Sequence, residues 1–464
     1  MVPLTRRALL AGASAGALTA ALPGGVLGAE APVAVLRSGL GRAHLEGSGR
    51  PAADLWLFNG RSPGPLLRLT RGVSQTVRVI NDLAEPTTVH WHGLRIDNAM
   101  DGVPGLTQEP IPPGGTFDYT LTPPDSGSFW YHSHYKGAVQ MDRGLYGPLI
   151  VEDDSPLDVD LDHMVVLDDW RLTEQGALDQ RGYGDVRERA HGGRYGNVLT
   201  INGREQETLP VPADGWVRLR LLNAANARVL PLTLTGANAW VAAKDGLTTR
   251  LVGLDPNPLL LAPAQRVDLL IRTAAPGTTV ALSFVSPQET LALLTLEIGD
   301  TVAPERTPTL TPAALPEPDR TDPFRVPLPM EGGAMGGLEG ARHKGVRKPL
   351  RELAREHGLV WALAGDAGMP EKPLFTVARG RTVELGMANL TGWDHAMHVH
   401  GHHLRVVEWS QRPPQVGGWH DTVLMRPREN VIAAFVADNP GKWLLHCHMM
   451  EHHAGGMVTW FEVT

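Results

Sequence analysis

The sequence predicts an all-β protein built from three β-sandwich domains. From about residue 33 onward, short stretches alternate apolar and polar residues, and Gly, Pro, Asn or Asp bounds them at short intervals, as is typical of antiparallel sandwich strands. A weak internal repeat occurs three times along the chain. Helical periodicity is nearly absent, and its best candidate is a short charged stretch at about 347–357. The 464 residues are enough for about two to four ordinary domains.

Residues 1–29 resemble an export signal. Arg6 and Arg7 precede an apolar run of Ala, Gly and Leu that reaches about Leu22, and small residues follow to Ala29. This order is typical of a Tat-type signal peptide, whereas the run is too short and too rich in Gly and Ser for a membrane anchor. We therefore expect a soluble protein that is exported to the periplasm or secreted.

The formal net charge of −8 limits the partners of the protein. It gives no indication of nucleic acid or of an anionic membrane surface. No stretch after the N-terminal segment is long and apolar enough to span a bilayer. We expect a monomer with no nucleic-acid partner and no membrane span.

The internal repeat defines the domains. In each copy a strand and a turn lead to a Gly, and an alternating strand that ends in Asn follows; the copies occupy residues 57–81, 200–223 and 361–389. We expect the three β-domains at residues 33–153, 160–300 and 350–464. Residues 301–349 are rich in Pro and then in Gly, and they are predicted to form a long surface linker.

Four His-x-His pairs predict a metal site: His90/His92, His132/His134, His398/His400 and His446/His448. Side chains in a strand alternate between faces, so each pair aims two imidazoles the same way. One such pair alone would be an ordinary polar strand face, but four pairs indicate a site for several ions of copper, zinc or iron. Two pairs lie in the first domain and two in the third, so the site is expected between these domains, with the second as a structural spacer.

The single cysteine, Cys447, is the middle residue of the last pair, so its thiolate should face away from the other imidazoles. His395, His452 and Met457 lie nearby in the sequence. Two histidines, a thiolate and a thioether are the ligands of a blue-copper electron-transfer centre, whereas zinc prefers a tetrahedral set without a thioether. Met457 alone would be an ordinary core residue. In this spacing, copper is the favoured metal.

The position of Cys447 between two histidines suggests a mechanism. The thiolate would hold one metal while His446 and His448 hold others, and each residue of a strand spans only ~3.3 Å. One centre would collect single electrons and the other would store several. Four-electron reduction of dioxygen to water needs this division.

These motifs resemble those of the multicopper oxidases, which include laccases, bacterial cuprous oxidases and bilirubin oxidases. They are His90-Trp-His-Gly93, Gly127-Ser-Phe-Trp-Tyr-His-Ser-His134, His395-x-x-His-x-His-Gly-His402 and His446-Cys-His-x-x-x-His452-x-x-x-x-Met457. The resemblance covers nearly the whole chain after residue 33. It implies three cupredoxin-like Greek-key sandwiches and four copper ions.

The resemblance also implies a role for each ligand. The type 1 copper would be held by His395, Cys447, His452 and Met457. The type 2 copper would be held by His90 and His398. The binuclear type 3 pair would be held by His92, His132, His134, His400, His446 and His448. Asp101 falls where the family has an acid that assists protonation of reduced oxygen, although a loop Asp beside Gly102 could also be a turn residue.

One position departs from the family pattern. Many bacterial members have Glu directly after the last type 1 histidine, and this chain has His453 there. Either His453 relays protons or another acid, such as Glu451, does so. We predict that His453→Glu changes the pH profile of oxygen reduction without loss of colour.

The electron donor stays open. An axial Met457 suggests a lower potential than Leu or Phe would give, which favours Cu(I), Fe(II), electron-rich phenols and aromatic amines as donors. The Met-rich insert of some cuprous oxidases is hardly present. Asp394 could attract a cationic donor or be a solvated turn residue. A metal-detoxifying cuprous oxidase is therefore the alternative to a laccase.

Two other classes fit the sequence less well. Copper nitrite reductases share the β-domain but usually have two domains and lack the His446-Cys-His448 bridge. A non-enzymatic relative that kept the fold would have lost ligands, and here every ligand of the motifs is present.

Overall fold

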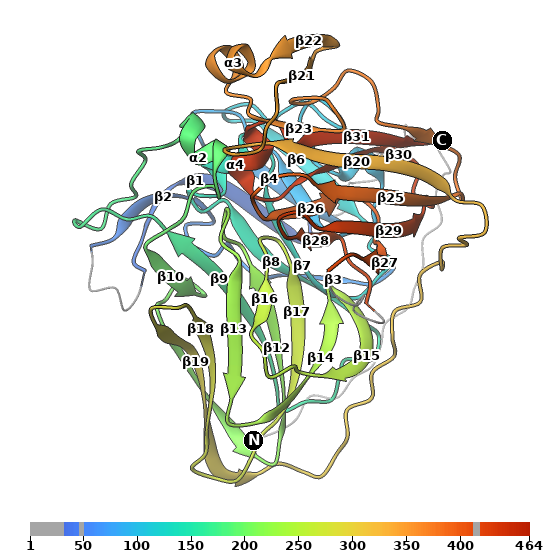
Figure 1. The fold of residues 1–464 in the computed structure, drawn as a ribbon. Coiled ribbons are helices and arrows are strands. Elements are labelled where there is room, and N and C mark those ends of the chain that lie inside the picture. Colours follow the sequence, from blue (N-terminus) through green and yellow to red (C-terminus); the bar gives the residue numbers. More distant parts are fainter. Residues whose placement is uncertain (1–31, 46–50, 412–417) are drawn as a thin grey trace, which may run out of the picture.

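Three β-sandwiches pack against one another in the structure (Figure 1). It is a computed structural model, and it describes residues 32–45, 51–411 and 418–464. The second sandwich forms the lower part of the view in Figure 1, and the third lies above it. The predicted signal peptide, residues 1–29, lies outside the described residues. The predicted all-β class with three sandwich domains is confirmed.

The first sandwich pairs two four-stranded sheets. Its strands are β1 (Ala34–Ala43), β2 (Ala53–Phe58), β3 (Leu67–Thr70), β4 (Gln75–Asn81), β5 (Val89–His92), β6 (Thr116–Leu121), β7 (Gly127–Ser133) and β8 (Tyr146–Glu152). One sheet has the order β2-β1-β4-β6 and the other β3-β8-β7-β5. Alternate residues such as Val77 and Val79 are buried between the sheets, as the apolar alternation of the sequence predicts. Two short helices, η1 (Asn98–Met100) and α1 (Gly137–Gln140), lie in its loops.

The second sandwich pairs a six-stranded sheet with a five-stranded sheet. Its strands are β9 (Leu161–Trp170), β10 (Val198–Ile201), β11 (Glu207–Ala213), β12 (Trp216–Asn223), β13 (Leu230–Thr235), β14 (Asn238–Lys244), β15 (Leu247–Gly253), β16 (Leu259–Leu261), β17 (Arg266–Arg272), β18 (Thr279–Val285) and β19 (Thr290–Val302). They form a sheet of order β10-β9-β12-β17-β14-β15 and a sheet of order β11-β19-β18-β13-β16. Between β9 and β10 lies the short helix α2 (Val186–Ala190).

The third sandwich has sheets of order β23-β20-β25-β29-β27 and β24-β31-β30-β26-β28. Its elements are β20 (Phe324–Gly332), β21 (Gly340–His343), β22 (Val346–Pro349), α3 (Leu350–Glu352), η2 (Leu353–His357), β23 (Trp361–Leu363), β24 (Thr376–Val377), β25 (Thr382–Asn389), β26 (His395–Val399), β27 (Arg405–Trp409), β28 (Thr422–Met425), β29 (Asn430–Val436), β30 (Gly441–Cys447), α4 (Met450–Ala454) and β31 (Val458–Val463). The helical turns α3 and η2 fall within the stretch predicted to be helical.

The third sandwich begins earlier than predicted. β20 pairs in parallel with β25, as β1 pairs with β4 and β9 with β12, so β20 is the first strand of the third copy. The predicted linker at 301–349 was therefore wrong from residue 324 onward. Pro327 and Pro329 suggested a linker, but both lie within β20. β23 pairs only with Met330–Gly332 and the Pro329 carbonyl accepts the Ala364 N–H just past β23 at 2.9 Å, so Pro327 lies where β20 has a partner on one side alone. Proline is tolerated at such an edge.

Each sandwich repeats one turn built on an asparagine. β4, β12 and β25 end at Asn81, Asn223 and Asn389, and each Oδ1 accepts the backbone N–H two residues later at 3.0 Å. Each Nδ2 donates to two backbone carbonyls across the turn. Because the amide satisfies several backbone groups at once, the asparagine has a physical reason to recur in every copy.

Residues 303–323 contain no helix or strand and run along the side of the molecule from the second sandwich to the third (Figure 1). The Ala313 N–H donates to the Thr248 carbonyl of the second sandwich at 2.9 Å. Ala313 and Leu315 pack against the core of the first sandwich. The connecting segment is therefore fixed to the sandwiches that it passes.

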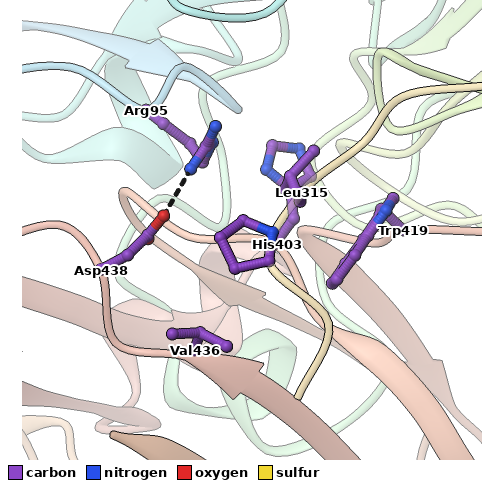
Figure 2. A pocket seen from close by; sticks show the side chains of 7 residues that line it. Arg95, Leu315, His403, Trp419, Val436 and Asp438 are labelled. Atoms are coloured by element: carbon purple, nitrogen blue, oxygen red, sulfur yellow. Dashed lines mark hydrogen bonds and ion pairs between the residues drawn. The ribbon is translucent and has the colours of Figure 1, made fainter. Parts of the chain in front are cut away.

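Leu315 also lies over the boundary between the first and third sandwiches (Figure 2). It lines a small pocket with His403 and Trp419 of the third sandwich. At the same place Arg95 of the first sandwich donates to Asp438 of the third at 2.9 Å. This contact fixes the two outer sandwiches to each other.

No helix in the described part of the chain is long and apolar enough to cross a membrane.

Candidate metal centre

Two ladders of neighbouring strands carry the His-x-His pairs. β5 pairs with β7 and sets His90 opposite His132, while β26 pairs with β30 and sets His398 opposite His446. Directly opposed residues of antiparallel strands have Cβ atoms ~5 Å apart, so each ladder brings together imidazoles from two pairs. The second histidine of each pair follows two residues later on the same face.

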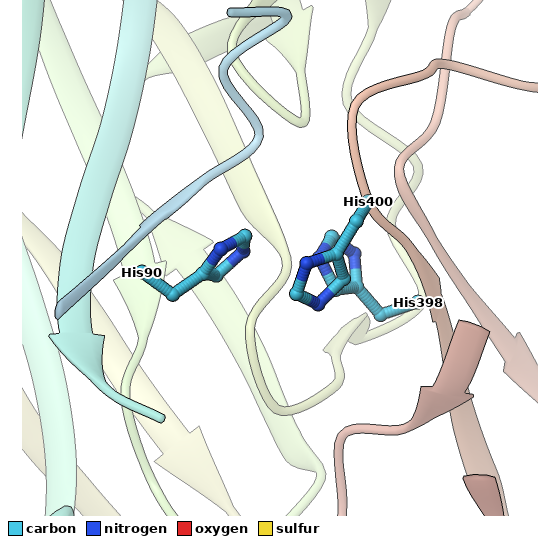
Figure 3. Close-up of side chains that lie close together, drawn as sticks. All are labelled: His90, His398 and His400. Carbon is cyan, nitrogen blue, oxygen red and sulfur yellow. The ribbon is translucent and has the colours of Figure 1, made fainter. Parts of the chain in front are cut away.

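The two ladders face each other across the boundary between the first and third sandwiches. His90 of β5 points toward His398 and His400 (Figure 3). His90 stacks on His400 with ring centroids 3.9 Å apart, and His92 stacks on His398 at 3.7 Å. All eight histidines of the four pairs lie in one cluster, and none of them is more than 8% exposed.

Hydrogen bonds on the outer side of the rings determine which nitrogen faces inward. His90 Nδ1–H donates to the main-chain oxygen of Asp101 at 2.8 Å, and His398 Nδ1–H donates to that of Asp421 at 2.9 Å. His92 has the opposite orientation, because its Nε2–H donates to Asp421 Oδ1 at 3.2 Å. The inner nitrogens of these rings, Nε2 of His90 and His398 and Nδ1 of His92, are buried without a hydrogen-bond partner among the described residues. Three lone pairs therefore point into the cluster.

Other imidazoles face each other nitrogen to nitrogen. His400 Nε2 lies 3.2 Å from His446 Nε2, and His132 Nε2 lies 3.4 Å from His448 Nε2. The Nδ1 atoms of His400, His446 and His132 donate outward, to Asp101, the Cys447 carbonyl and the Ser133 carbonyl. Lone pairs therefore meet between His400 and His446, and a cation bound between them satisfies both.

Burial keeps these rings neutral. It lowers the pKa of His92, His132, His134, His400, His446 and His448 well below the usual value, and the neighbouring imidazoles lower it further. A neutral imidazole is the form that binds a metal.

A second group of ligand atoms lies within the third sandwich. Cys447 Sγ lies 3.7 Å from His395 Nδ1 and 3.7 Å from His452 Nδ1, and the two nitrogens are 3.0 Å apart. Both rings are held from outside, because His395 Nε2–H donates to Thr391 Oγ1 at 2.9 Å and His452 Nε2–H donates to the His191 carbonyl at 2.6 Å. One sulfur and two nitrogens thus converge on a point, which is the trigonal donor set of a blue-copper site.

The thiol of Cys447 needs a cation to ionise. The residue is fully buried, and burial raises the pKa of its thiol to about 12. Met457 is also fully buried and lies in the same core as Cys447. Its N–H donates to the His452 carbonyl at 3.0 Å, and its carbonyl accepts the Cys447 N–H at 3.1 Å. The donors present at this point fit copper.

Cys447 connects the two groups of ligand atoms covalently. It is the last residue of β30, and its side chain faces His395 and His452 while His446 and His448 on either side face the histidine cluster. The alternation of side chains along the strand produces this division. The shortest bonded route from the sulfur to the cluster is one peptide unit in either direction.

Asp101 holds two imidazoles of the cluster. The residue is 2% exposed, and its carboxylate Oδ2 accepts His400 Nδ1–H at 2.9 Å while its main-chain oxygen accepts His90 Nδ1–H. Gly102 follows at a φ of +81°, where a Cβ would lie 1.9 Å from the Val89 carbonyl oxygen. The chain therefore turns at Asp101 directly against β5.

Asp421 and Trp361, which contact ligand rings directly, are among the contributors that were not predicted from the sequence. Asp421, which precedes β28, orients His92 and His398, and Trp361 packs under both rings of the Cys447 group, with centroids 5.1 Å from His395 and 4.5 Å from His452. A single Asp in Trp-His-Asp-Thr before an apolar strand is a weak signal, and a lone Trp is weaker still.

The second sandwich does more than the predicted spacer. It supplies no imidazole to the cluster, but the carbonyl of His191 holds His452 and the Trp361 Nε1–H donates to the Arg189 carbonyl at 2.5 Å. Arg266 of β17 also forms an ion pair with Asp421. These contacts tie the second sandwich to both groups of ligand atoms.

The two candidates for the family's missing acid occupy different places. The ring of His453 lies 4.5 Å from His446 and 5.7 Å from His134, beside the cluster. Glu451 points instead toward the second sandwich, where its carboxylate accepts the Arg194 N–H at 3.1 Å and the Asn226 Nδ2–H at 3.4 Å. The predicted relay role of His453 stays a prediction, with geometry that favours it over Glu451.

Comparisons with known proteins agree with this geometry. Residues 40–156 and 350–464 match two family models that are both described as multicopper oxidase. The chain is 29% identical to the multicopper oxidase MmcO of Mycobacterium tuberculosis, over 89% of this chain and 83% of that protein. Its sequence is 32% identical to that of a multicopper oxidase from Pseudomonas thermotolerans whose crystal structure is known. The two structures match with a TM-score of 0.82 over 94% of this chain and 100% of the Pseudomonas chain. The chain is 34% identical to the structure of Lac15 from a marine microbial metagenome, with a TM-score of 0.73, over 93% and 100%.

Proposed function

The chain belongs to the multicopper oxidase family, and on that premise we propose that it is a laccase-like oxidase whose donors are phenols and aromatic amines. Its three sandwiches are cupredoxin-like. The four copper ions of the family, one type 1, one type 2 and a binuclear type 3 pair, couple one-electron oxidation of a reducing substrate to four-electron reduction of dioxygen to water.

The residues that would hold each copper follow from the two groups of ligand atoms. We assign the type 1 copper to His395, Cys447, His452 and Met457. We assign the type 2 copper to His90 and His398, whose inner nitrogens have no other partner among the described residues. We assign the type 3 pair to His92, His132, His134, His400, His446 and His448.

The chain itself supplies an electron path and a proton donor. Cys447 is bonded through the backbone to His446 and His448, so the donor side and the oxygen side are joined by one peptide unit each way. The Asp101 carboxylate lies against His400 within the buried cluster. Because each turnover must deliver four protons to oxygen, we assign Asp101 the transfer of protons at this site.

One observation carries the proposal for the donor. His452 is fully buried, and its only outward atom, Nε2, donates to the carbonyl of His191 at 2.6 Å. His191 is exposed, and its ring meets Trp393 edge to face with centroids 5.3 Å apart. Tyr195, four residues further on, is 43% exposed. The surface nearest the type 1 ligands is therefore aromatic, and a flat ring donor can stack on it.

Oxidation of Cu(I) is the second candidate, because Met335 is 81% exposed next to the same surface. The Ala334 N–H donates to the Ala190 carbonyl at 2.6 Å. Met335 follows Ala334 and His191 follows Ala190, so this hydrogen bond brings Met335 and His191 close to each other. His191 Nδ1–H donates to the Arg187 carbonyl, so its Nε2 is the nitrogen left for a soft cation. By contrast, Met330, Met387 and Met397 are buried in the core.

Steady-state oxidation of a methoxyphenol and of Cu(I) by the copper-loaded enzyme separates the candidates. We expect Trp393→Ala to raise KM for the phenol several-fold with unchanged blue absorption, and Met335→Leu to leave phenol oxidation unchanged. Trp240→Ala and Met369→Leu are matched controls, since both residues are partly exposed and lie outside this surface. If Trp393→Ala leaves the phenol oxidation rate unchanged and Met335→Leu lowers the Cu(I) oxidation rate, the chain is a cuprous oxidase and the laccase-like proposal is wrong.

A further inference from the structure

Arg266, the first residue of β17, joins the second sandwich to the histidine cluster. Its side chain is fully buried. Nη1 donates to Asp421 Oδ1 at 2.9 Å and Nη2 donates to Asp421 Oδ2 at 2.6 Å, so the guanidinium grips a carboxylate of the third sandwich with two parallel hydrogen bonds. Nε donates to the Ser128 carbonyl of the first sandwich at 3.2 Å. All three sandwiches meet at this one side chain.

Asp421, which binds Arg266, also accepts hydrogen bonds from two imidazoles of the cluster. Its Oδ1 accepts His92 Nε2–H at 3.2 Å and the Thr422 hydroxyl at 2.8 Å, and its main-chain oxygen accepts His398 Nδ1–H at 2.9 Å. His92 belongs to the first sandwich and His398 to the third, and their rings stack at 3.7 Å. A single residue therefore orients two ligands that come from opposite sides of the cluster.

The carboxylate has no solvent with which to share its charge. Asp421 is fully buried; besides His92 and His398, His403 lies 3.7 Å from its carboxylate, and Asp245 lies 3.7 Å from Arg266 Nη1, with Asp268 also acting on the guanidinium. A buried carboxylate is strongly unfavourable without a cation, so Arg266 is the group that keeps Asp421 charged and in place. A lysine is a point charge and does not reproduce the two parallel hydrogen bonds.

The backbone of the first sandwich leaves space for this pair. Gly93, directly after His92, has a φ of +86°, which disfavours every other residue. A Cβ at this position would lie 2.3 Å from Arg266 Nη2 and 2.6 Å from Asp421 Oδ2. The guanidinium and carboxylate thus fill the place where a side chain would otherwise stand.

We propose that Arg266 is a positioning residue of the type 2 and type 3 copper sites, which acts through Asp421 to hold His92 Nδ1 and His398 Nε2 toward the copper ions. Both inner nitrogens are buried and without another partner among the described residues, so their direction depends on the outer hydrogen bonds. The proposal rests on the assigned ligand sets but not on the identity of the electron donor. It makes the second sandwich a working part of the oxygen-reducing site.

The test uses Arg266→Lys and Arg266→Met in the full chain. Loss of an outer hydrogen bond to a metal ligand typically weakens metal affinity by about 10–100-fold. We therefore expect each variant to lose type 2 and type 3 copper to a competing chelator at about 10–100-fold lower chelator concentration than the wild type. Copper counts and the electron paramagnetic resonance signal of type 2 copper report this loss. The blue absorption per chain should stay unchanged, since Cys447 and its partners do not touch Arg266.

Arg218→Lys is the matched control. Arg218 is 7% exposed and forms a similar ion pair with Asp268 in the same sandwich, without contact to an imidazole. It should lose stability without selective loss of copper. Wild-type copper retention in Arg266→Lys and Arg266→Met, or a proportional loss of blue and type 2 copper, would overturn the proposal. So would failure of both variants to fold, because Arg266 would then serve stability alone. A wild-type chain that holds four coppers but oxidises no phenol would contradict only the proposed donor.

Discussion

Copper binding by Cys447 should depend steeply on pH and should release a proton. Burial raises the pKa of this thiol from the usual 9.0 to about 12, so the thiol of the metal-free protein is protonated throughout the neutral range. Copper binds the thiolate, and binding therefore includes the removal of one proton. The sign follows directly: affinity for copper at the type 1 site rises as pH rises.

The magnitude follows from the pKa. At pH 7 a thiol with a pKa of about 12 lies about five units from ionisation, which costs about 7 kcal/mol at ~1.36 kcal/mol per unit. A thiol at 9.0 would lie two units away, at about 3 kcal/mol, so burial adds about 4 kcal/mol to the cost of copper binding. Between pH 7 and 9 the buried imidazoles are already neutral, and the thiol alone should raise the affinity about tenfold per pH unit.

The assay loads the metal-free protein with Cu(II) against a chelator of known affinity at several values between pH 7 and 9. Blue absorption measures occupancy of the type 1 site, and a pH indicator in weakly buffered solution counts the protons released. Cys447→Ser is the matched control, because it keeps every imidazole but has no thiol to ionise. At pH 8 the wild type should release one proton per chain more than this variant.

Equal proton release by the wild type and Cys447→Ser would show that the thiol is already ionised without metal, and the argument from burial would then be wrong. An affinity that does not change between pH 7 and 9 would have the same meaning.

Three further outcomes are expected. The metal-free protein should lose stability as pH falls from 7 to 5, because burial lowers the pKa of imidazoles such as His132 and His446, and the unfolded chain takes up protons below pH ~6.5. Each such ring costs up to about 2 kcal/mol at pH 5, and calorimetry that finds the metal-free protein as stable at pH 5 as at pH 7 would contradict this. His92→Ala should keep the blue absorption but stop oxygen consumption in an oxygen electrode, and a rate above a tenth of the wild type would argue against its ligand role. Trp361→Phe should lose about 1–3 kcal/mol of stability and shift the blue band, because its Nε1–H bond to Arg189 and part of the ring against His452 are removed. Trp216→Phe, which loses a similar bond to the Arg306 carbonyl, should leave the band unchanged in the same denaturation and absorption measurements.

The parts of the fold that local chemistry determines could be predicted from the sequence. Asn81, Asn223 and Asn389 recur because each satisfies the same backbone groups, and so the repeat was visible despite low identity. The start of the third sandwich was not visible. Pro327 and Pro329 are typical of linkers, and only the pairing partners of β20 show that they lie within a strand, with Pro327 where that strand has a partner on one side alone.

The residues of the metal centre also fall into those that could be predicted from the sequence and those that could not. The His-x-His pairs and Cys447 were predictable because strand alternation converts their spacing into direction. Asp421 and Arg266 were not, since each is one charged residue at the start of an apolar strand, and 155 residues separate them. The role of Asp421 and Arg266 depends on how the three sandwiches pack against one another, and a local sequence pattern does not predict that packing.

The histidine cluster also imposes an order on synthesis of the enzyme. One ladder, β5 with β7, is complete by Ser133, whereas the other requires β30, which ends more than 300 residues later at Cys447. A nascent chain that lacks this last segment carries His398 and His400 but has neither the thiol of Cys447 nor the imidazoles of His446 and His448. The connection between the two groups of ligand atoms therefore forms only when β30 has been made, because Cys447 and the histidines on either side of it are the residues that join them.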